Sequence, residues 1–114
     1  MNVFEKVKAA ADSIGIYACP DLYTKGDQEM WITYNLAFEQ GAIYGDDIAN
    51  DLTSGVQIHL FLDKDTNFFA IRRQLRAALI EQGFTHPEMV LNSLEDNKIR
   101  HIVFECEHDA ESED

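Results

Sequence analysis

The side chains most suited to metal binding or nucleophilic attack are spread along this sequence without the spacing that such chemistry needs. They are Cys19, His59, His86, His101, Cys106 and His108. A zinc site takes four protein ligands, or three and a water molecule, and the closest ligand pair here is Cys106 with His108. His59 and His101 are expected at strand centres, where they could face each other across neighbouring strands. Two imidazoles do not complete a site, so we expect no metal and no cofactor.

Other potential chemical motifs have a simpler structural interpretation. Asp63, Asp65 and Asn67 resemble the start of a calcium loop, but Phe68 stands where that loop requires glycine. They are better candidates for capping the helix that follows. Cys19 has no histidine near it in the sequence, and we interpret it as a small apolar residue. Phosphate-binding glycine loops and the motifs of serine hydrolases and metalloproteases are absent from the sequence. We therefore predict that the protein is not an enzyme.

An acidic group, Asp46, Asp47 and Asp51, lies in the stretch from 40 to 51, among glycine and asparagine residues. We interpret this stretch as a long loop or an irregular hairpin, because it contains few regular signals. Paired carboxylates can hold a metal or transfer protons. No base, nucleophile or phosphate clamp accompanies these three, so we expect no catalytic role for them.

A helix is predicted from about residue 67 to 82, and it carries the most unusual surface in the sequence. Its core stripe consists of Phe68, Ile71, Leu75, Ala78 and Leu79. A second band about a quarter-turn away, with the neighbouring Arg72, gives the candidate interface residues Phe69, Arg72, Arg73, Arg76 and Ile80. Arginine beside aromatic and aliphatic side chains is typical of protein interfaces. Its complement is an acidic surface, which another copy of this chain would supply. The alternative is a solvated helix face with Phe69 folded over the edge of the core.

Length, composition and charge restrict the class of protein. The chain has 114 residues, of which 46% are hydrophobic, so it can form one domain with its own core. The net charge of −12 argues against binding to nucleic acid or to an anionic membrane surface. No apolar run approaches the ~20 residues needed to span a bilayer. The N-terminus lacks the layout of a signal peptide, so we expect the protein to be made in the cytoplasm, with both cysteines reduced.

The remaining elements follow from periodicity and turn residues. The apolar stripe that begins at Val3 predicts a helix between Asn2 as N-cap and Gly15 as the terminating residue. Strands are predicted at 16–18, 30–38, 55–62, 89–94 and 98–106, with a turn at 95–97. We predict an α+β fold with a mixed or mostly antiparallel sheet of about four to five strands and two helices packed on one face. A crossover at 56–82 would permit parallel pairing there. Residues 1–107 form the domain, and 108–114 are expected to be an acidic disordered tail.

The order of these segments resembles the tail terminator proteins of long-tailed siphophages, also called tail-completion or head–tail joining proteins, with the lambda-type terminator fold. The resemblance covers residues 2–107 and rests on element order and length. Its segments are the first helix with the extended stretch up to Pro20, Trp31-Ile32-Thr33-Tyr34-Asn35, Val56-Gln57-Ile58-His59-Leu60-Phe61, Ile71-Arg72-Arg73-Gln74-Leu75-Arg76-Ala77-Ala78-Leu79 with Gly83-Phe84, and His101-Ile102-Val103-Phe104-Glu105.

This resemblance implies a structural protein of the virion tail that is assembled in the host cytoplasm. Such proteins form a ring, usually a homo-hexamer, that caps the tail-tube protein and meets the head–tail connector protein. An acidic inner surface would let DNA slide through the ring, and Asp46, Asp47 and Asp51 could line that channel. Those acids could equally serve only to keep a monomer soluble before assembly. The acidic C-terminal tail is a departure that the resemblance does not explain.

Two other functions are compatible with this sequence. One is a small DNA mimic or other inhibitor that places carboxylates in the basic groove of an enzyme. Against it, half of the net charge lies in the last ten residues, and no predicted helix carries an acidic stripe. The other is a small regulatory or ligand-binding domain, which would contain a pocket. The oligomeric state separates these functions, because a mimic is normally a monomer or a dimer.

Overall fold

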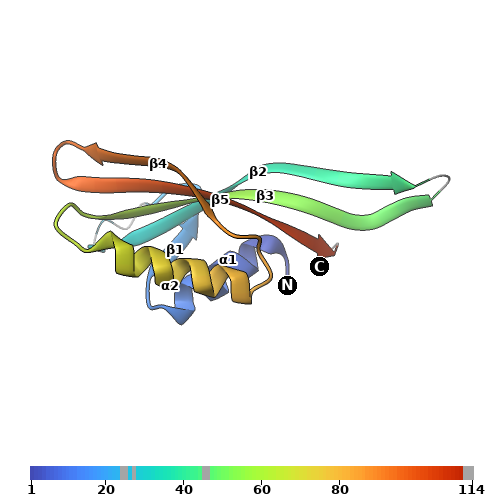
Figure 1. The fold of residues 1–114 in the computed structure, drawn as a ribbon, viewed down its shortest axis with the longest axis horizontal. Coiled ribbons are helices and arrows are strands. Elements are labelled where there is room, and N and C mark those ends of the chain that lie inside the picture. The colour runs from blue at the N-terminus through green and yellow to red at the C-terminus, as the bar shows by residue number, and fades with distance from the viewer. Residues whose placement is uncertain (24–25, 27, 45–46, 112–114) are drawn as a thin grey trace.

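The protein has two helices and one five-stranded sheet (Figure 1). The computed structural model describes residues 1–23, 26, 28–44 and 47–111, and it describes only the backbone at 41–44, 47–52, 110 and 111. The helices are α1 (Val3–Ser13) and α2 (Phe68–Glu81), and the strands are β1 (Tyr17–Pro20), β2 (Trp31–Tyr44), β3 (Asp47–Asp63), β4 (Glu88–Glu95) and β5 (Ile99–Glu111). Both helices lie on the same face of the sheet. The predicted α+β class and the mixed five-stranded sheet are confirmed.

The strand order is β1-β2-β3-β5-β4, and every neighbouring pair is antiparallel except β1 with β2. The crossover through α2 therefore does not create a parallel pair. It connects β3 to β4, which run in the same direction but are separated by β5. Neither helix is both long and apolar enough to cross a membrane, within the part of the chain that the structure describes.

Capping residues fix the ends of both helices as the sequence predicted. The Asn2 side chain accepts from the Glu5 backbone N–H, and the Glu5 carboxylate accepts from the Asn2 backbone N–H, each at 2.8 Å. This reciprocal pair satisfies two of the free N–H groups at the start of α1. At the start of α2, the Asn67 side chain accepts from the backbone N–H of Phe69. Beyond the helix ends, Gly15 and Gly83 adopt positive φ angles that favour glycine.

Of the two interpretations of residues 40–51, the irregular hairpin is confirmed and the long loop is wrong, within the residues that the structure describes. Strand β2 continues to Tyr44, strand β3 starts at Asp47, and the two pair with each other. Glycine, asparagine and aspartate are weak strand formers, so the local signal was poor, and pairing with a neighbouring strand overrides it. Asp47 and Asp51 therefore belong to a strand. Asp46 lies outside the described residues.

The prediction of a disordered tail is also wrong for residues 108–111, which form the end of β5. This end pairs with the extended part of β3, as far as Asp51 opposite Glu111. The Thr53 hydroxyl donates to the Asp109 carboxylate at 2.7 Å. A polar, acidic strand forms here because a long neighbouring strand offers its backbone groups. Residues 112–114 lie outside the described residues.

The core lies between the helices and one face of the sheet. Both predicted helix stripes are confirmed, with α1 contributing four of the buried residues and α2 three. The buried core residues of the sheet include Ile32, Tyr34, Val56, Ile58, Leu60, Leu62, Ile102, Phe104 and Cys106. They alternate with residues that face away from the helices, and we call this second side the outer face. Trp31, His59 and Phe61 lie on the outer face.

Candidate assembly surface on helix α2

Helix α2 presents two distinct sides. Leu75, Ala78 and Leu79 are buried against the sheet. The predicted interface residues, which we call the arginine band, lie outside this buried stripe: Phe69, Arg72, Arg73, Arg76 and Ile80. The Phe69 side chain is 55% exposed and the Ile80 side chain is 46% exposed. Arg73 is exposed, and Arg72 and Arg76 are half-buried. Apolar and cationic groups are thus available on one helix side.

Aromatic contacts hold the start of the arginine band in place. The guanidinium of Arg72 lies 5.4 Å from the centre of the Phe69 ring, a cation–π distance. The Phe69 ring stacks on the Phe68 ring with 4.4 Å between the centres. On the other side, the Arg100 guanidinium lies 5.3 Å from the Phe68 ring. The Nε atom of Arg72 is buried without a hydrogen-bond partner. Phe69 is therefore held on the surface by its neighbours and does not fold into the core.

The arginines of α2 make no ion pairs within the described part of the chain. The ion pairs found there join Lys8 to Asp12 at 2.8 Å and His101 to Glu95 at 2.7 Å. The sequence contains 21 acidic residues, and Glu88 lines the same groove as Arg72 and Arg76, yet no carboxylate of the described residues lies within ion-pair distance of the arginine band. An unpaired cationic band on an acidic protein is a surface that suits an anionic partner.

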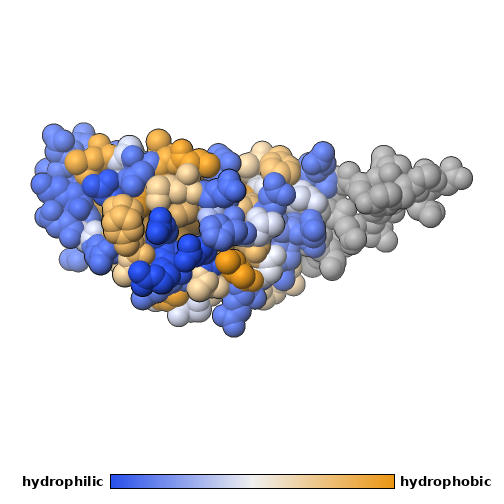
Figure 2. Space-filling view, in the orientation of Figure 1, coloured by the Kyte–Doolittle hydropathy of each residue, from blue (hydrophilic) through white to orange (hydrophobic). Residues whose placement is uncertain are grey.

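A groove separates the arginine band from the edge strand β4. It has a volume of about 280 Å³ and an apolar floor formed by Leu75, Pro87, Met89 and Phe104, with Arg72 and Arg76 on its rim. Met89 is 37% exposed. Figure 2 shows strongly hydrophilic and hydrophobic side chains side by side on this face of the molecule. The groove and the arginine band together form a continuous surface that no element of the described chain covers.

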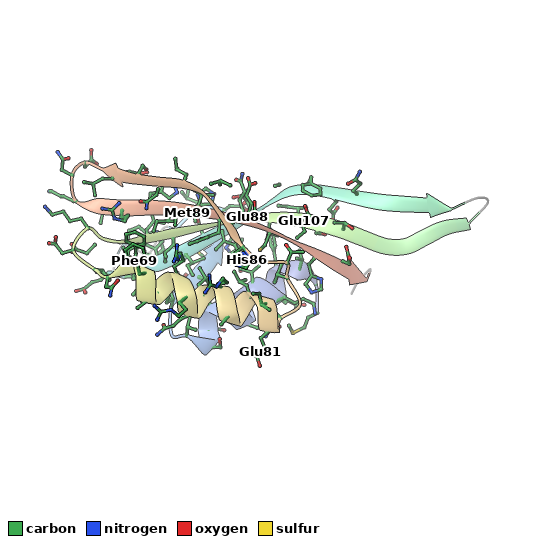
Figure 3. The ribbon with its side chains drawn as sticks, viewed as in Figure 1. Phe69, Glu81, His86, Glu88, Met89 and Glu107 are labelled. Carbon is green, nitrogen blue, oxygen red and sulfur yellow. The ribbon has the colours of Figure 1, made fainter. Side chains whose placement is uncertain are left out.

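A second hollow, which the sequence did not reveal, opens beside the outer face where β2 and β3 extend past the helices. Its volume is about 480 Å³, and its lining includes Phe38, Gly55, Glu88, Glu105 and Glu107. We call it the acidic hollow. Figure 3 shows Glu88 and Glu107 near the start of β4, apart from Phe69 at the other end of α2. The available signal was the alternation of acids at 105, 107 and 109, which places them on one side of a strand.

His59 and His101 do face each other on neighbouring strands. The Nδ1 atom of His59 lies 2.9 Å from Nε2 of His101, and His101 Nδ1 lies 2.7 Å from the Glu95 carboxylate. His59 Nε2 lies 3.1 Å from the Asn35 amide oxygen. Burial, and secondly the nearby His101, lower the pKa of His59. The described residues contain no group of three ligating side chains that would complete a metal site, so this pair is part of the sheet's hydrogen bonding.

The fold is shared with a chain of a gene transfer agent virion. A chain in the solved structure titled "Virion of native gene transfer agent (GTA) particle" matches this chain with a TM-score of 0.54 and 13% sequence identity. The match covers 96% of this chain and 92% of that chain. No protein-family model and no curated protein matches this sequence. At 13% identity the similarity concerns the fold, and it extends over nearly the whole of both chains.

Proposed function

We propose that this protein is a structural component of a phage-like virion that caps the tail tube as a ring and joins it to the head connector. The observation that carries the proposal is the fold, which matches a chain of a gene transfer agent virion along 96% of the present sequence. The uncovered arginine band supports a protein built to bind other copies or partners. The proposal places the protein in the virion tail after assembly in the host cytoplasm, and it assigns no catalytic step and no cofactor.

The charge of the molecule suits a ring through which DNA passes. A net charge of −12 repels the phosphates of the duplex, so DNA would slide and not adhere. The predicted channel residues Asp46, Asp47 and Asp51 remain a prediction, since their side chains lie outside the described part of the structure.

Electron microscopy of tail tubes tests this function directly. The tail-tube protein from the same genome is polymerised with this protein carrying a gold-labelled affinity tag. We expect the label at one end of each tube, with growth arrested there. Label along the sides of the tubes, or no label on them, would contradict the proposal.

One observation favours an inhibitor of a basic protein as the second candidate function. Glu105, Glu107 and Asp109 alternate along β5, so they form a row of carboxylates on the outer face about 7 Å apart. An ordered row of this kind is what a mimic of nucleic acid presents. A mimic would bind a basic DNA-binding enzyme as a monomer, with steep salt dependence, and it would not join tail tubes.

A further inference from the structure

The chain carries two surfaces of opposite charge, and the described residues leave both without an ionic partner. The arginine band lies on α2, and the acidic hollow lies beside β5, where the sheet extends past the helices. We propose that these surfaces are the two halves of one contact, in which Arg73 and Arg76 of one copy enter the acidic hollow of the next copy. This inference rests on the proposed function and specifies how the ring closes.

The walls of the acidic hollow fit a guanidinium group. The Phe38 ring lies directly over Gly55, where any Cβ atom would collide with it. The lining also includes Glu105 and Glu107, and Glu107 pairs with Gly55 across the neighbouring strands. A guanidinium between an aromatic face and carboxylates gains both a cation–π contact and charge-assisted hydrogen bonds. Lysine would gain less, because its ammonium lacks the planar donor fork.

The close placement of carboxylates in the acidic hollow also points to a cationic partner. Glu88 stands directly opposite Glu105 in the β4–β5 pairing, and like charges in such a position destabilise a sheet. Glu107 follows Glu105 on the same side of β5. No lysine or arginine forms an ion pair with any of these carboxylates in the described part of the chain. A bound cation would therefore remove a cost that the isolated chain carries.

The spacings of the two surfaces agree. Arg73 and Arg76 are three residues apart on α2, which places their Cβ atoms about 5–6 Å apart. Glu105 and Glu107 are two residues apart on a strand, which places them about 7 Å apart. Two neighbouring arginines can therefore meet two neighbouring carboxylates at the same time. The exposed Phe69 and Ile80 then come to lie against the second copy and add apolar burial.

A second copy is the partner that this chemistry favours. The chain has nine basic residues, three of them in the arginine band, so its own remaining surface is acidic. The band belongs to the helix layer, whereas the acidic hollow lies at the extension of the sheet, and Glu88 marks the boundary between them. When each copy presents these two surfaces to two different neighbours, the contact is head-to-tail, and repetition of that contact closes a ring.

Charge reversal in two separate chains tests the contact. The first variant is Arg73→Glu/Arg76→Glu, and the second is Glu105→Arg/Glu107→Arg. Each alone places like charges in every contact, and we expect self-association to weaken by about 100-fold or more. In an equimolar mixture, the two variants alternate and every contact again joins opposite charges. We expect the mixture to recover the wild-type assembly, measured by light scattering up to about 1 mM protein.

Matched controls separate this contact from a general effect of charge. Lys64→Glu/Lys98→Glu and Glu29→Arg/Asp65→Arg change the charge equally at exposed positions, and we expect them to leave assembly unchanged. Circular dichroism checks that all the variants fold.

Three outcomes would overturn the inference. In the first, the wild-type protein stays monomeric at about 1 mM. In the second, the mixture of the two variants does not assemble. In the third, the mixture assembles only as far as a dimer. These measurements use no tail protein, so their failure is separate from that of the tube-binding experiment.

Discussion

Strands β2 and β3 run through two regions of the molecule that differ in what stabilises them. In the helix-covered region, Ile58, Leu60 and Leu62 on β3 are fully buried. In the uncovered extension of the same sheet, Leu36 is 42% exposed and Phe38 is 41% exposed. Figure 1 shows β2 and β3 projecting well past both helices, and the molecule measures 54 × 24 × 22 Å. One end of this strand pair therefore contributes to the core, and the other end forms an exposed surface.

Different interactions stabilise the two regions. Each large apolar side chain buried under the helices contributes about 1.5–3 kcal/mol through removal from water. The extension is a single layer and lacks that contribution. It depends on backbone pairing and on cross-strand bonds such as Thr53 to Asp109. Its exposed apolar and acidic side chains are consequently available to a partner.

A buried charge in the covered region should have the largest effect. Val7 of α1 is 1% exposed, and Val7→Asp would bury an unpaired carboxylate. We expect a loss of about 4 kcal/mol or more, enough to unfold a marginally stable domain. Leu36→Asp in the extension makes a similar chemical change and should cost about 1 kcal/mol or less. Urea denaturation followed by circular dichroism measures both. Equal losses of stability in the two variants would mean that the covered region and the extension do not differ in what stabilises them.

Removal of the end of β5 should have an intermediate effect. Deletion of residues 108–114 removes the bond from His108 Nε2 to the Gln82 carbonyl at 2.9 Å and the Asp109 bond to Thr53. It also uncovers Ser54, which is 3% exposed. We expect a loss of about 1–3 kcal/mol, seen as a lower melting temperature.

The double variant His108→Ala/Asp109→Ala keeps the backbone of that end, so it isolates the part of the loss that comes from side chains. An unchanged melting temperature in the truncated protein would show that this end of β5 adds no stability.

The sequence predicted the covered region well because several local signals agreed there. Asn2 and Asn67 each stand before an apolar helical stripe, and Gly15 and Gly83 each follow one, so the helix ends required no knowledge of distant residues. Apolar and polar residues alternate clearly in the centres of the strands, because one side of each strand is buried. Local preference and tertiary contacts point to the same structure in this region.

The extension was predicted poorly because its order depends on partners far away in the sequence. Residues 40–44 and 108–111 carry weak or polar strand signals and become strands by pairing with β3. The two candidate surfaces differ in the same respect, because one depends on a local signal and the other on distant residues. The arginine band follows from the helical period of a single segment. The acidic hollow requires Phe38 to lie over Gly55, beside the acids of β5, and a break in register between Leu36 and Phe38 contributes to that placement.

A change at Gly55 tests whether the Phe38 ring shapes the acidic hollow. The Cβ atom of Gly55→Ala would meet the ring, and the exposed ring can swing away. We therefore expect a loss of stability of about 1 kcal/mol or less, together with roughly 10-fold weaker self-association. Light scattering and thermal melting measure the two effects. Phe38→Leu removes the ring without adding an atom at Gly55, so it should weaken self-association equally. If Gly55→Ala weakens self-association and Phe38→Leu does not, the Phe38 ring is not what shapes the contact.

The smallest effect is expected from the histidine pair on the outer face of the covered region. Burial lowers the pKa of His59 from its ordinary value of 6.5, so below about that pH the unfolded chain binds a proton more readily than the fold does. Stability should then fall as the pH drops from 6.5 toward the lower pKa of the folded state. His59→Gln removes this titration. It should reduce the slope of stability against pH by less than about 1.4 kcal/mol per pH unit, which is the limit for one proton.

Denaturation between pH 5 and 8 measures the slope, with the exposed His86→Gln as the matched control. Because His59 lies opposite Val103 on β5 and bonds to His101, any flattening reports on the sheet under the helices and not on the extension. A variant with the wild-type slope would show that acid destabilises the protein through other groups.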